Sequence, residues 1–465
     1  MVALAAENTK SSAYLAIILR DRPRLNKGTI MLKSSRYNFE FSYEGRKFLY
    51  NILTTSLIER TEDILADGIR NPSSDVAQSL ISNGFLANDN SDEQLKYGYY
   101  FDAIRFGSAS RNLKVTLIPT YSCNLACPYC YQGQDKRIEK MDFSGVERVL
   151  HFLDFVAMEG KNTDAISKVS ISLYGGEPMM DKEALEIFCA GAYTIASGYE
   201  LPISFDMTTN LTLLDGKMIA MIRKYKIAIQ VTIDGPKYYH DKKRIYRNKL
   251  GTFDDIIKNL QRLKENGLSN LVTIRINIDK DTIDYAEAAF MSVNDYSPNI
   301  YFSVVRHYKG ANDCHKGFCV PEDLYSSFTT RTNEILKKHE RPVYRQFGKR
   351  TPCTLATPNK YYIDCKFDVY GCDSLVNHPE CRIGTLDKDG RLNLSNFYYR
   401  QMATTAIRTV KCQGCKWMPM CGGGCPAEAY INSGRNDGNL ECQCVVDEKS
   451  LTDYLIDYVK RLEIQ

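Results

Sequence analysis

The chain has 465 residues, of which 44% are hydrophobic and 25% charged, as expected for a globular protein with buried cores. Its 60 basic and 56 acidic side chains leave a net charge of +4, which argues against a broad surface for nucleic acid or an anionic membrane. No apolar stretch reaches the roughly 20 residues of a membrane helix, and no secretory cleavage site follows the apolar run at residues 13–19. We therefore expect a cytoplasmic protein of several domains.

Residues 1–110 contain no cysteine and are expected to form a small α+β module, similar to a winged helix. The alternation of short apolar pieces and turns predicts strands at 29–33, 38–43 and 47–53, followed by helices at 62–69 and 75–82. A polar segment near residues 88–94 is expected to end this module.

Residues 111–310 follow a different rhythm, in which apolar runs alternate with helical patterns. Six runs are expected to be strands, at 115–119, 169–174, 203–207, 227–233, 271–278 and 300–305. Such repetition predicts an α/β fold with a parallel sheet, whose chemistry lies at the carboxyl ends of the strands. Six units are too few for a closed eight-unit barrel, so we expect an open, partial (βα)6 barrel.

Cysteine becomes frequent after a helical connector at residues 311–350. Ten of the sixteen cysteines lie between Cys353 and Cys444, and none precedes Cys123. Clusters at such short gaps predict metal ligands better than a disulfide framework. The domain at 351–465 is expected to end in an amphipathic helix at 447–462.

The first cysteine motif is Cys123, Cys127 and Cys130, spaced CxxxCxxC just after the first strand of the barrel. Three thiolates can hold three irons of a 4Fe–4S cluster and leave the fourth iron open for reaction, whereas zinc prefers four closed ligands. The motif resembles that of the radical S-adenosylmethionine (radical SAM) superfamily. The resemblance implies that the open iron binds S-adenosylmethionine, whose reductive cleavage yields a 5′-deoxyadenosyl radical that abstracts hydrogen.

Residues near the ends of the following strands are expected to contact this cofactor. The segment Gly175, Gly176, Glu177 and Pro178 resembles the one that binds the methionine amino group in the family, although a tight turn would explain the glycines. Polar strand ends supply Thr209, Asn210, Thr232 and Asp234, and Tyr129 is expected to shield the cluster. Arg244 lies in a segment that resembles the HDxxR motif of peptide-modifying members, and it could pair with a carboxylate or belong to a solvated charge run.

A second pattern, CxxCxxxxxCxxxC, is formed by Cys412, Cys415, Cys421 and Cys425. Together with Cys353 and Cys372 upstream it resembles the SPASM domain, although zinc would also suit its CxxC pair. The resemblance implies one auxiliary 4Fe–4S cluster on Cys412, Cys415, Cys421 and a final cysteine, for which Cys444 is preferred to Cys442. A second auxiliary cluster would use Cys353, Cys372 and Cys425, with Cys365, Cys314, Cys319 or no residue as its fourth ligand. The glycine of the pattern falls on Phe367, so we expect that turn to close differently.

Two further features bear on the substrate. Asp373 occupies the place of the acidic residue that acts as a base in sulfatase-maturating members, although a turn carboxylate is an equally plain interpretation. The N-terminal module loosely resembles leader-recognising domains, which bind a peptide as an added strand, or it is only a stabilising extension.

Together these patterns predict a radical SAM/SPASM enzyme with three 4Fe–4S clusters. We expect it to install a thioether, carbon–carbon or ether cross-link in a ribosomally made precursor peptide. The alternatives are oxidation of a sulfatase cysteine or serine to formylglycine, then epimerisation or backbone excision, and, in another class, a zinc-binding interaction module. The expected partners are a precursor peptide or protein and an electron donor of the flavodoxin or ferredoxin type.

Overall fold

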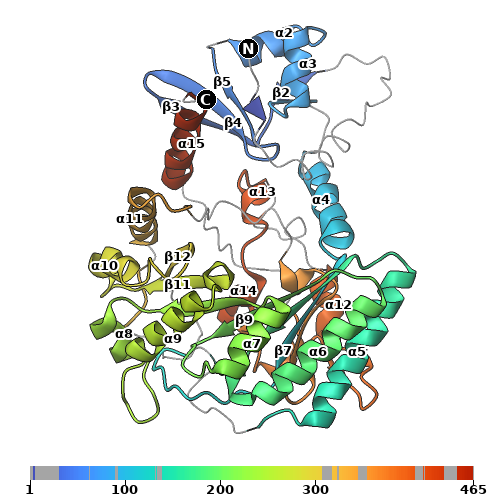
Figure 1. Cartoon of the computed structure of the whole chain (residues 1–465). Coiled ribbons are helices and arrows are strands. Elements are labelled where there is room, and N and C mark those ends of the chain that lie inside the picture. The colour runs from blue at the N-terminus through green and yellow to red at the C-terminus, as the bar shows by residue number, and fades with distance from the viewer. Residues whose placement is uncertain are drawn as a thin grey trace.

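The computed structural model shows a large sheet with helices on one face and a smaller N-terminal sheet beyond it (Figure 1). It describes residues 4–5, 31–61, 63–88, 93–130, 132, 139–305, 317–321, 324–343, 353–403, 412, 414–433 and 448–463. Among these residues, no helix is long and apolar enough to cross a membrane.

The large sheet has ten strands in the order β12-β11-β10-β9-β8-β7-β13-β14-β15-β16. Its parallel part consists of β7 (Asn112–Ile118), β8 (Lys168–Leu173), β9 (Ile203–Thr209), β10 (Ala228–Ile233), β11 (Val272–Ile278) and β12 (Asn299–Val304). These are the six strands that the apolar runs predicted, in sequential order and in an open sheet. The expectation of a mostly parallel α/β sheet is confirmed.

The two faces of this sheet differ in polarity because side chains alternate along each strand. In β10, Ile229, Val231 and Ile233 are buried under the helices, whereas Gln230 and Thr232 on the opposite face are half-buried. The helices that accompany the strands are α5 (Phe143–Asn162), α6 (Lys182–Gly198), α7 (Gly216–Tyr225), α8 (Lys237–Lys243), α9 (Phe253–Glu265) and α10 (Ala286–Met291). The face away from the helices is therefore the polar one, which suits it to hold a polar ligand.

The cysteine-rich segment continues the same sheet, which the sequence did not indicate. Strand β13 (Lys360–Asp364) pairs in parallel with β7, and β14 (Asp368–Tyr370), β15 (Gly384–Leu386) and β16 (Leu392–Leu394) follow antiparallel. This pairing satisfies the edge of β7, which would otherwise be open to other chains. Helices α12 (Asn396–Ala403), α13 (Met418–Cys421) and α14 (Pro426–Ser433) complete the described part of the segment.

The N-terminal sheet has the order β1-β5-β4-β3, formed by Leu4–Ala5, Ser56–Glu59, Arg46–Asn51 and Asn38–Tyr43. A separate ladder joins β2 (Leu32–Ser34) to β6 (Leu86–Asn88), and helices α2 (Ile64–Arg70) and α3 (Asp75–Ser82) pack in a core with Leu49 and Ile58. Helix α4 (Glu93–Ala103) begins where a polar end of the module was expected.

The last helix packs on the first sheet (Figure 1). Helix α15 (Glu448–Glu463) buries Leu451, Leu455 and Val459 against Phe39 and Phe48 of the N-terminal sheet. The connector helix α11 (Tyr325–Lys338) lies near α10 and β12. The amphipathic helix was expected, but its partner at the other end of the chain was not.

Candidate active site and cofactor-binding residues

The first cysteine motif lies in the loop after β7. Cys123 and Cys127 are buried, Cys130 is half-buried, and the three pack in one cluster with Leu125 and Tyr129. The residues after α8 hold this loop in place, because Ala126 N–H donates to the carbonyl of Ile245 at 2.8 Å and Arg247 Nε donates to that of Cys123 at 3.1 Å. Burial raises the pKa of the Cys127 thiol, and the nearby Arg244 guanidinium opposes that rise.

This donor set fits an iron–sulfur cluster. No group of three or more His, Cys, Asp and Glu side chains in the described part of the chain converges on one metal ion. In a cubane each thiolate binds a different iron, so the thiols surround a cluster and do not meet at a point. Three thiols from one loop, packed in one cluster with apolar and aromatic side chains, suit such a group.

The glycine pair after β8 lies against the backbone of the cysteine loop. A Cβ on Gly175 would lie 2.5 Å from the carbonyl oxygen of Thr120, and one on Gly176 would lie 2.2 Å from that of Ser122. Gly176 N–H donates to the Thr120 carbonyl at 3.1 Å, and Glu177 N–H donates to the Ser122 carbonyl at 2.9 Å. Glycine is therefore required for this close approach as well as for the left-handed backbone at Gly175, where φ is 135°.

The buried Glu177 carboxylate joins the ends of β8 and β9. It accepts hydrogen bonds from Met179 N–H at 3.0 Å, Thr209 Oγ1 at 2.7 Å and Asn210 N–H at 2.7 Å. Burial raises the pKa of Glu177, and these hydrogen bonds oppose the rise. Pro178 follows as the buried first residue of a 3₁₀ turn at Pro178–Asp181. The side chains of Glu177 and Thr209 thus shape the site, and their contact with the cofactor stays a prediction.

Asp234, Tyr129 and Arg244 come together beside the cysteine loop. Asp234 accepts hydrogen bonds from Tyr129 Oη and, at 2.9 Å, from Asn277 Nδ2, while Arg244 Nη1 donates to Tyr129 Oη at 3.0 Å. Arg244 Nε is buried and has no hydrogen-bond partner among the described residues. A half-buried cation whose Nε is a buried, unused donor close to the thiols suits an anionic group such as the carboxylate of an amino acid.

The segment before Arg244 is a support and not a solvated charge run. His240 is fully buried; its Nδ1 accepts from Asp234 N–H at 3.2 Å and its Nε2 lies 3.0 Å from Thr252 Oγ1. Lys243 forms a buried ion pair with Asp279. The sequence offered no direct signal for these scaffolding roles beyond the HDxxR pattern itself.

The other two residues predicted to contact the cofactor, Asn210 and Thr232, lie outside the network around Asp234. Asn210 Nδ2 donates to Asn124 Oδ1 at 3.0 Å and lies 3.8 Å from Cys123 Sγ, so it reaches the cysteine loop. Thr232 lies on the polar face in register with Arg275, outside the network around Asp234.

The C-terminal cysteines form two groups. Burial raises the pKa of the Cys372 thiol, and the Asp373 carboxylate and the nearby thiols of Cys353 and Cys425 add to the rise. We call Cys353, Cys372 and Cys425 the first C-terminal thiol group. Cys412, Cys415 and Cys421, the second C-terminal thiol group, gather near Tyr97 of α4. None of the thirteen described cysteines forms a disulfide. Cys314, Cys442 and Cys444 lie outside the described residues.

A run of glycines separates the two groups. Gly422, Gly423 and Gly424 have φ values of 63°, 90° and 85°, so the chain between Cys421 and Cys425 turns through left-handed backbone that only glycine adopts readily. Their significance was missed in the sequence, where a CGGGC string was itself the available signal.

Cys365 and Cys319 are both half-buried. Cys365 packs beside Tyr121 and Tyr370, at the turn between β13 and β14. In the same region Tyr121 Oη donates to Asp364 Oδ2 at 2.6 Å, which ties the cysteine loop of the first motif to the C-terminal segment.

Phe367 corrects one expectation. Its φ is 64°, the left-handed conformation that a glycine at this position of the SPASM pattern would favour. The turn therefore has the backbone that the glycine of the pattern would adopt, with the strain of a side chain added. The Arg148 guanidinium stacks 3.8 Å from the centre of its ring.

Asp373 lies next to the first C-terminal thiol group. Its Oδ1 accepts from Ser374 N–H at 2.9 Å and lies 3.5 Å from Cys372 Sγ. The carboxylate thus caps a local turn, as the plainer interpretation anticipated, and its role as a base stays a prediction.

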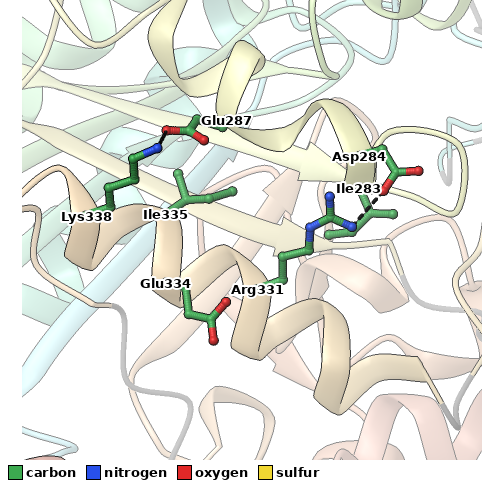
Figure 2. Close-up of a pocket in the computed structure, with 7 residues that line it drawn as sticks. All are labelled: Ile283, Asp284, Glu287, Arg331, Glu334, Ile335 and Lys338. Atoms are coloured by element: carbon green, nitrogen blue, oxygen red, sulfur yellow. Dashed lines mark hydrogen bonds and ion pairs between the residues drawn. The ribbon is translucent and has the colours of Figure 1, made fainter.

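A separate pocket lies between α10 and α11 and contains none of the predicted site residues (Figure 2). It is lined by Ile283, Asp284, Glu287, Arg331, Glu334, Ile335 and Lys338. Ion pairs join Asp284 to Arg331 at 2.7 Å and Glu287 to Lys338 at 2.8 Å. We assign it no part in the chemistry of the cysteine loop.

Comparison with known proteins decides the class of this site. Residues 117–291, which contain the cysteine loop and the carboxyl ends of β7 to β11, match the model of the radical SAM superfamily. This chain contains a radical SAM domain. Such a domain implies a 4Fe–4S cluster and S-adenosylmethionine as cofactors, and it sets aside the non-enzymatic zinc module.

Three similar proteins are informative. A cysteine-type anaerobic sulfatase-maturating enzyme from Clostridium novyi is 23% identical over 359 residues, 72% of this chain and 93% of that protein. Native anSMEcpe with bound AdoMet and Cp18Cys peptide has a TM-score of 0.55 at 19% identity, covering 76% of this chain and 98% of its own. Streptococcus suis SuiB bound to precursor peptide SuiA has a TM-score of 0.51 at 14% identity, covering 89% and 100%. The structural likenesses show a shared fold.

Proposed function

We propose that this radical SAM enzyme is a peptide maturase that carries two auxiliary clusters and cross-links a ribosomally made precursor. The observation that carries the proposal is the gathering of nine described cysteines into three groups of three thiols. The loop after β7 would hold the cluster that binds S-adenosylmethionine. The two C-terminal groups would hold auxiliary clusters, with Cys444 proposed to complete the second.

The bound cofactors would supply a 5′-deoxyadenosyl radical that abstracts hydrogen from the substrate. The residues of the chain would orient the reactants: Arg244 Nε would donate to a carboxylate, and Tyr129 and Asp234 would hold the guanidinium in place. The polar face of the sheet, with Thr232 and Arg275, would contact the ribose or the substrate. Asp373 would accept the proton that the substrate radical loses, and an auxiliary cluster on the adjacent thiols of Cys353, Cys372 and Cys425 would accept its electron.

A peptide substrate is supported by the N-terminal sheet. Strand β3 pairs only with β4 among the described residues, and it stands at the end of the strand order. An extended leader peptide could add to such an edge through backbone hydrogen bonds. The fold of SuiB, a protein seen with a precursor peptide, covers 89% of this chain, whereas that of anSMEcpe covers 76%.

The second candidate is oxidation of a cysteine or serine of a sulfatase to formylglycine. The position of Asp373, 3.5 Å from Cys372 Sγ, favours it, as does the similarity to the maturating enzyme of Clostridium novyi. The two candidates share the radical step and differ in the product.

Anaerobic incubation of the reconstituted enzyme with S-adenosylmethionine and dithionite tests the proposal. We expect 5′-deoxyadenosine and methionine, and about twelve irons per chain if three cubanes are present. Replacing Cys123, Cys127 and Cys130 with alanine should abolish cleavage and leave about eight irons. Cleavage that persists in this variant would refute the site. The product distinguishes the two candidates: a maturase would give a precursor peptide that is 2 Da lighter and contains a cross-link in its fragmentation spectrum, whereas the second candidate would form formylglycine in a sulfatase peptide.

A further inference from the structure

Helix α4 leaves the N-terminal module and reaches the second C-terminal thiol group. Gln94 Oε1 accepts a hydrogen bond of 2.9 Å from Gly414 N–H, in the turn between Cys412 and Cys415. One turn later, Tyr97 Oη donates to the carbonyl of Met418 at 3.3 Å. Two successive turns of one helix thus bond to the backbone that carries these thiols.

The Tyr97 ring packs beside this thiol group. Only 3% of Tyr97 is exposed, and it packs in one cluster with Phe101, Cys412 and Met418. Burial raises the pKa of Tyr97, and the thiols of Cys421 and Cys412 lie close enough to add to the rise. Cys412 and Cys421 are themselves buried. Their surroundings are therefore supplied in part by a residue more than 300 positions earlier in the chain.

The start of α4 is anchored to the N-terminal sheet. The Glu93 carboxylate accepts from Ser35 Oγ at 2.5 Å and from Arg36 N–H at 3.2 Å, just before β3 begins at Asn38. The helix is thus bonded at its first residue to the turn before β3 and, through Gln94 and Tyr97, to the cysteine-bearing loop.

We propose that the N-terminal module forms one wall of the second C-terminal thiol group, with Tyr97 as the positioning residue that keeps water from Cys412 and Cys421. In the proposed function these thiols hold an auxiliary cluster, and the inference deepens that assignment. The solvent exposure of a cluster and the hydrogen bonds around it set its reduction potential. Tyr97 would then tune the electron acceptor from a part of the chain that otherwise serves substrate recognition.

The first test needs no cluster. The full-length, metal-free protein is alkylated with iodoacetamide, and modification of each cysteine is followed by peptide mass spectrometry. In Tyr97→Ala, Cys412 and Cys421 should react at least about tenfold faster than in the wild type, because local protection is lost. Tyr97→Phe keeps the ring and should restore protection to within about twofold. Tyr99→Ala is the matched control, since Tyr99 lies on the same helix with 63% of its surface exposed.

The second test uses the reconstituted enzyme with Cys123, Cys127 and Cys130 replaced by alanine, so that only auxiliary clusters contribute. Tyr97→Ala in this background should shift the electron paramagnetic resonance spectrum of the reduced protein and speed the loss of iron in air, whereas Tyr99→Ala should do neither. Alkylation rates equal to the wild type in Tyr97→Ala would overturn the inference. If alkylation is faster in Tyr97→Ala but the C-terminal thiols bind no iron on reconstitution, the inference that Tyr97 protects Cys412 and Cys421 is supported and the proposed auxiliary cluster is refuted. If Tyr97→Ala fails to fold, Gln94→Ala must raise the rate at Cys412, and an unchanged rate overturns the inference.

Discussion

Removing the charge of Asp234 is the sharpest test of how the candidate site is held together. Asp234 has 2% of its surface exposed, and its carboxylate accepts from Tyr129 Oη and Asn277 Nδ2. It is also the buried anion near the Arg244 guanidinium. Asp234→Ala would leave that cation without its nearby counter-charge and two buried donors without an acceptor. Asp234→Asn would keep an oxygen for Asn277 Nδ2, but its NH2 group cannot accept from Tyr129 Oη, so it would remove the charge and one of the two acceptors.

The expected loss of stability follows from these contacts. Leaving a buried donor without its acceptor costs about 1–3 kcal/mol, and because Asp234→Ala removes the acceptor of two donors, we expect a loss of about 2–6 kcal/mol. For Asp234→Asn we expect about 1–3 kcal/mol, the cost of an imperfect buried hydrogen bond. Asp284→Asn is the control, because Asp284 forms a surface ion pair with Arg331 across the pocket in Figure 2 and such pairs contribute about 0–1 kcal/mol.

The assay is guanidinium unfolding of the metal-free protein under reducing conditions, followed by tyrosine and tryptophan fluorescence. Transition midpoints are compared among variants, since a chain with several cores need not unfold in two states. If Asp234→Ala and Asp284→Asn shift the midpoint equally, the network does not contribute to stability in the way that its geometry indicates.

Three further predictions concern the same site. Gly176→Ala should force the Ser122 carbonyl away, strain the cysteine loop and lower 5′-deoxyadenosine formation by at least about tenfold. Gly216→Ala is the control, because its Cβ would meet nothing within 4 Å, and it should match the wild type. Equal rates of 5′-deoxyadenosine formation in the two variants would contradict the close approach at Gly176. Burial and the neighbouring cations Arg244, Lys243 and Lys237 hold the pKa of His240 well below its usual value, so His240 binds a proton more readily in the unfolded chain and stability should fall as the pH drops below about 6.5. In His240→Gln the difference between the unfolding midpoints at pH 7.5 and pH 5.5 should become smaller. An unchanged difference would count against a neutral His240. Asp373→Ala should leave cleavage of S-adenosylmethionine intact and lower the yield of modified peptide per 5′-deoxyadenosine, measured by chromatography; an unchanged yield would remove Asp373 from the mechanism.

Features that depend on residues close in sequence were predictable, and features that depend on distant residues were not. The six strands and the cysteine loop were predictable because alternation and spacing act over a few residues. The support around Asp234 was not, because it joins residues distant in sequence: Arg244 bonds to Tyr129 across 115 positions and Asn277 to Asp234 across 43. The CGGGC string at residues 421–425 lies between these two cases. Its glycines indicate left-handed backbone from local sequence, but only the structure shows that this backbone separates two thiol groups.

The sequence by itself therefore determined the class of the enzyme, the open parallel sheet and the loop of three thiols, since each is written in a local pattern. Only the tertiary structure decided that β13 completes the edge of β7, that α15 packs on the N-terminal sheet and that Tyr97 covers the second C-terminal thiol group. These pairings bury apolar surface and satisfy backbone groups between segments hundreds of residues apart, and no periodicity along the chain records which distant segment will do so.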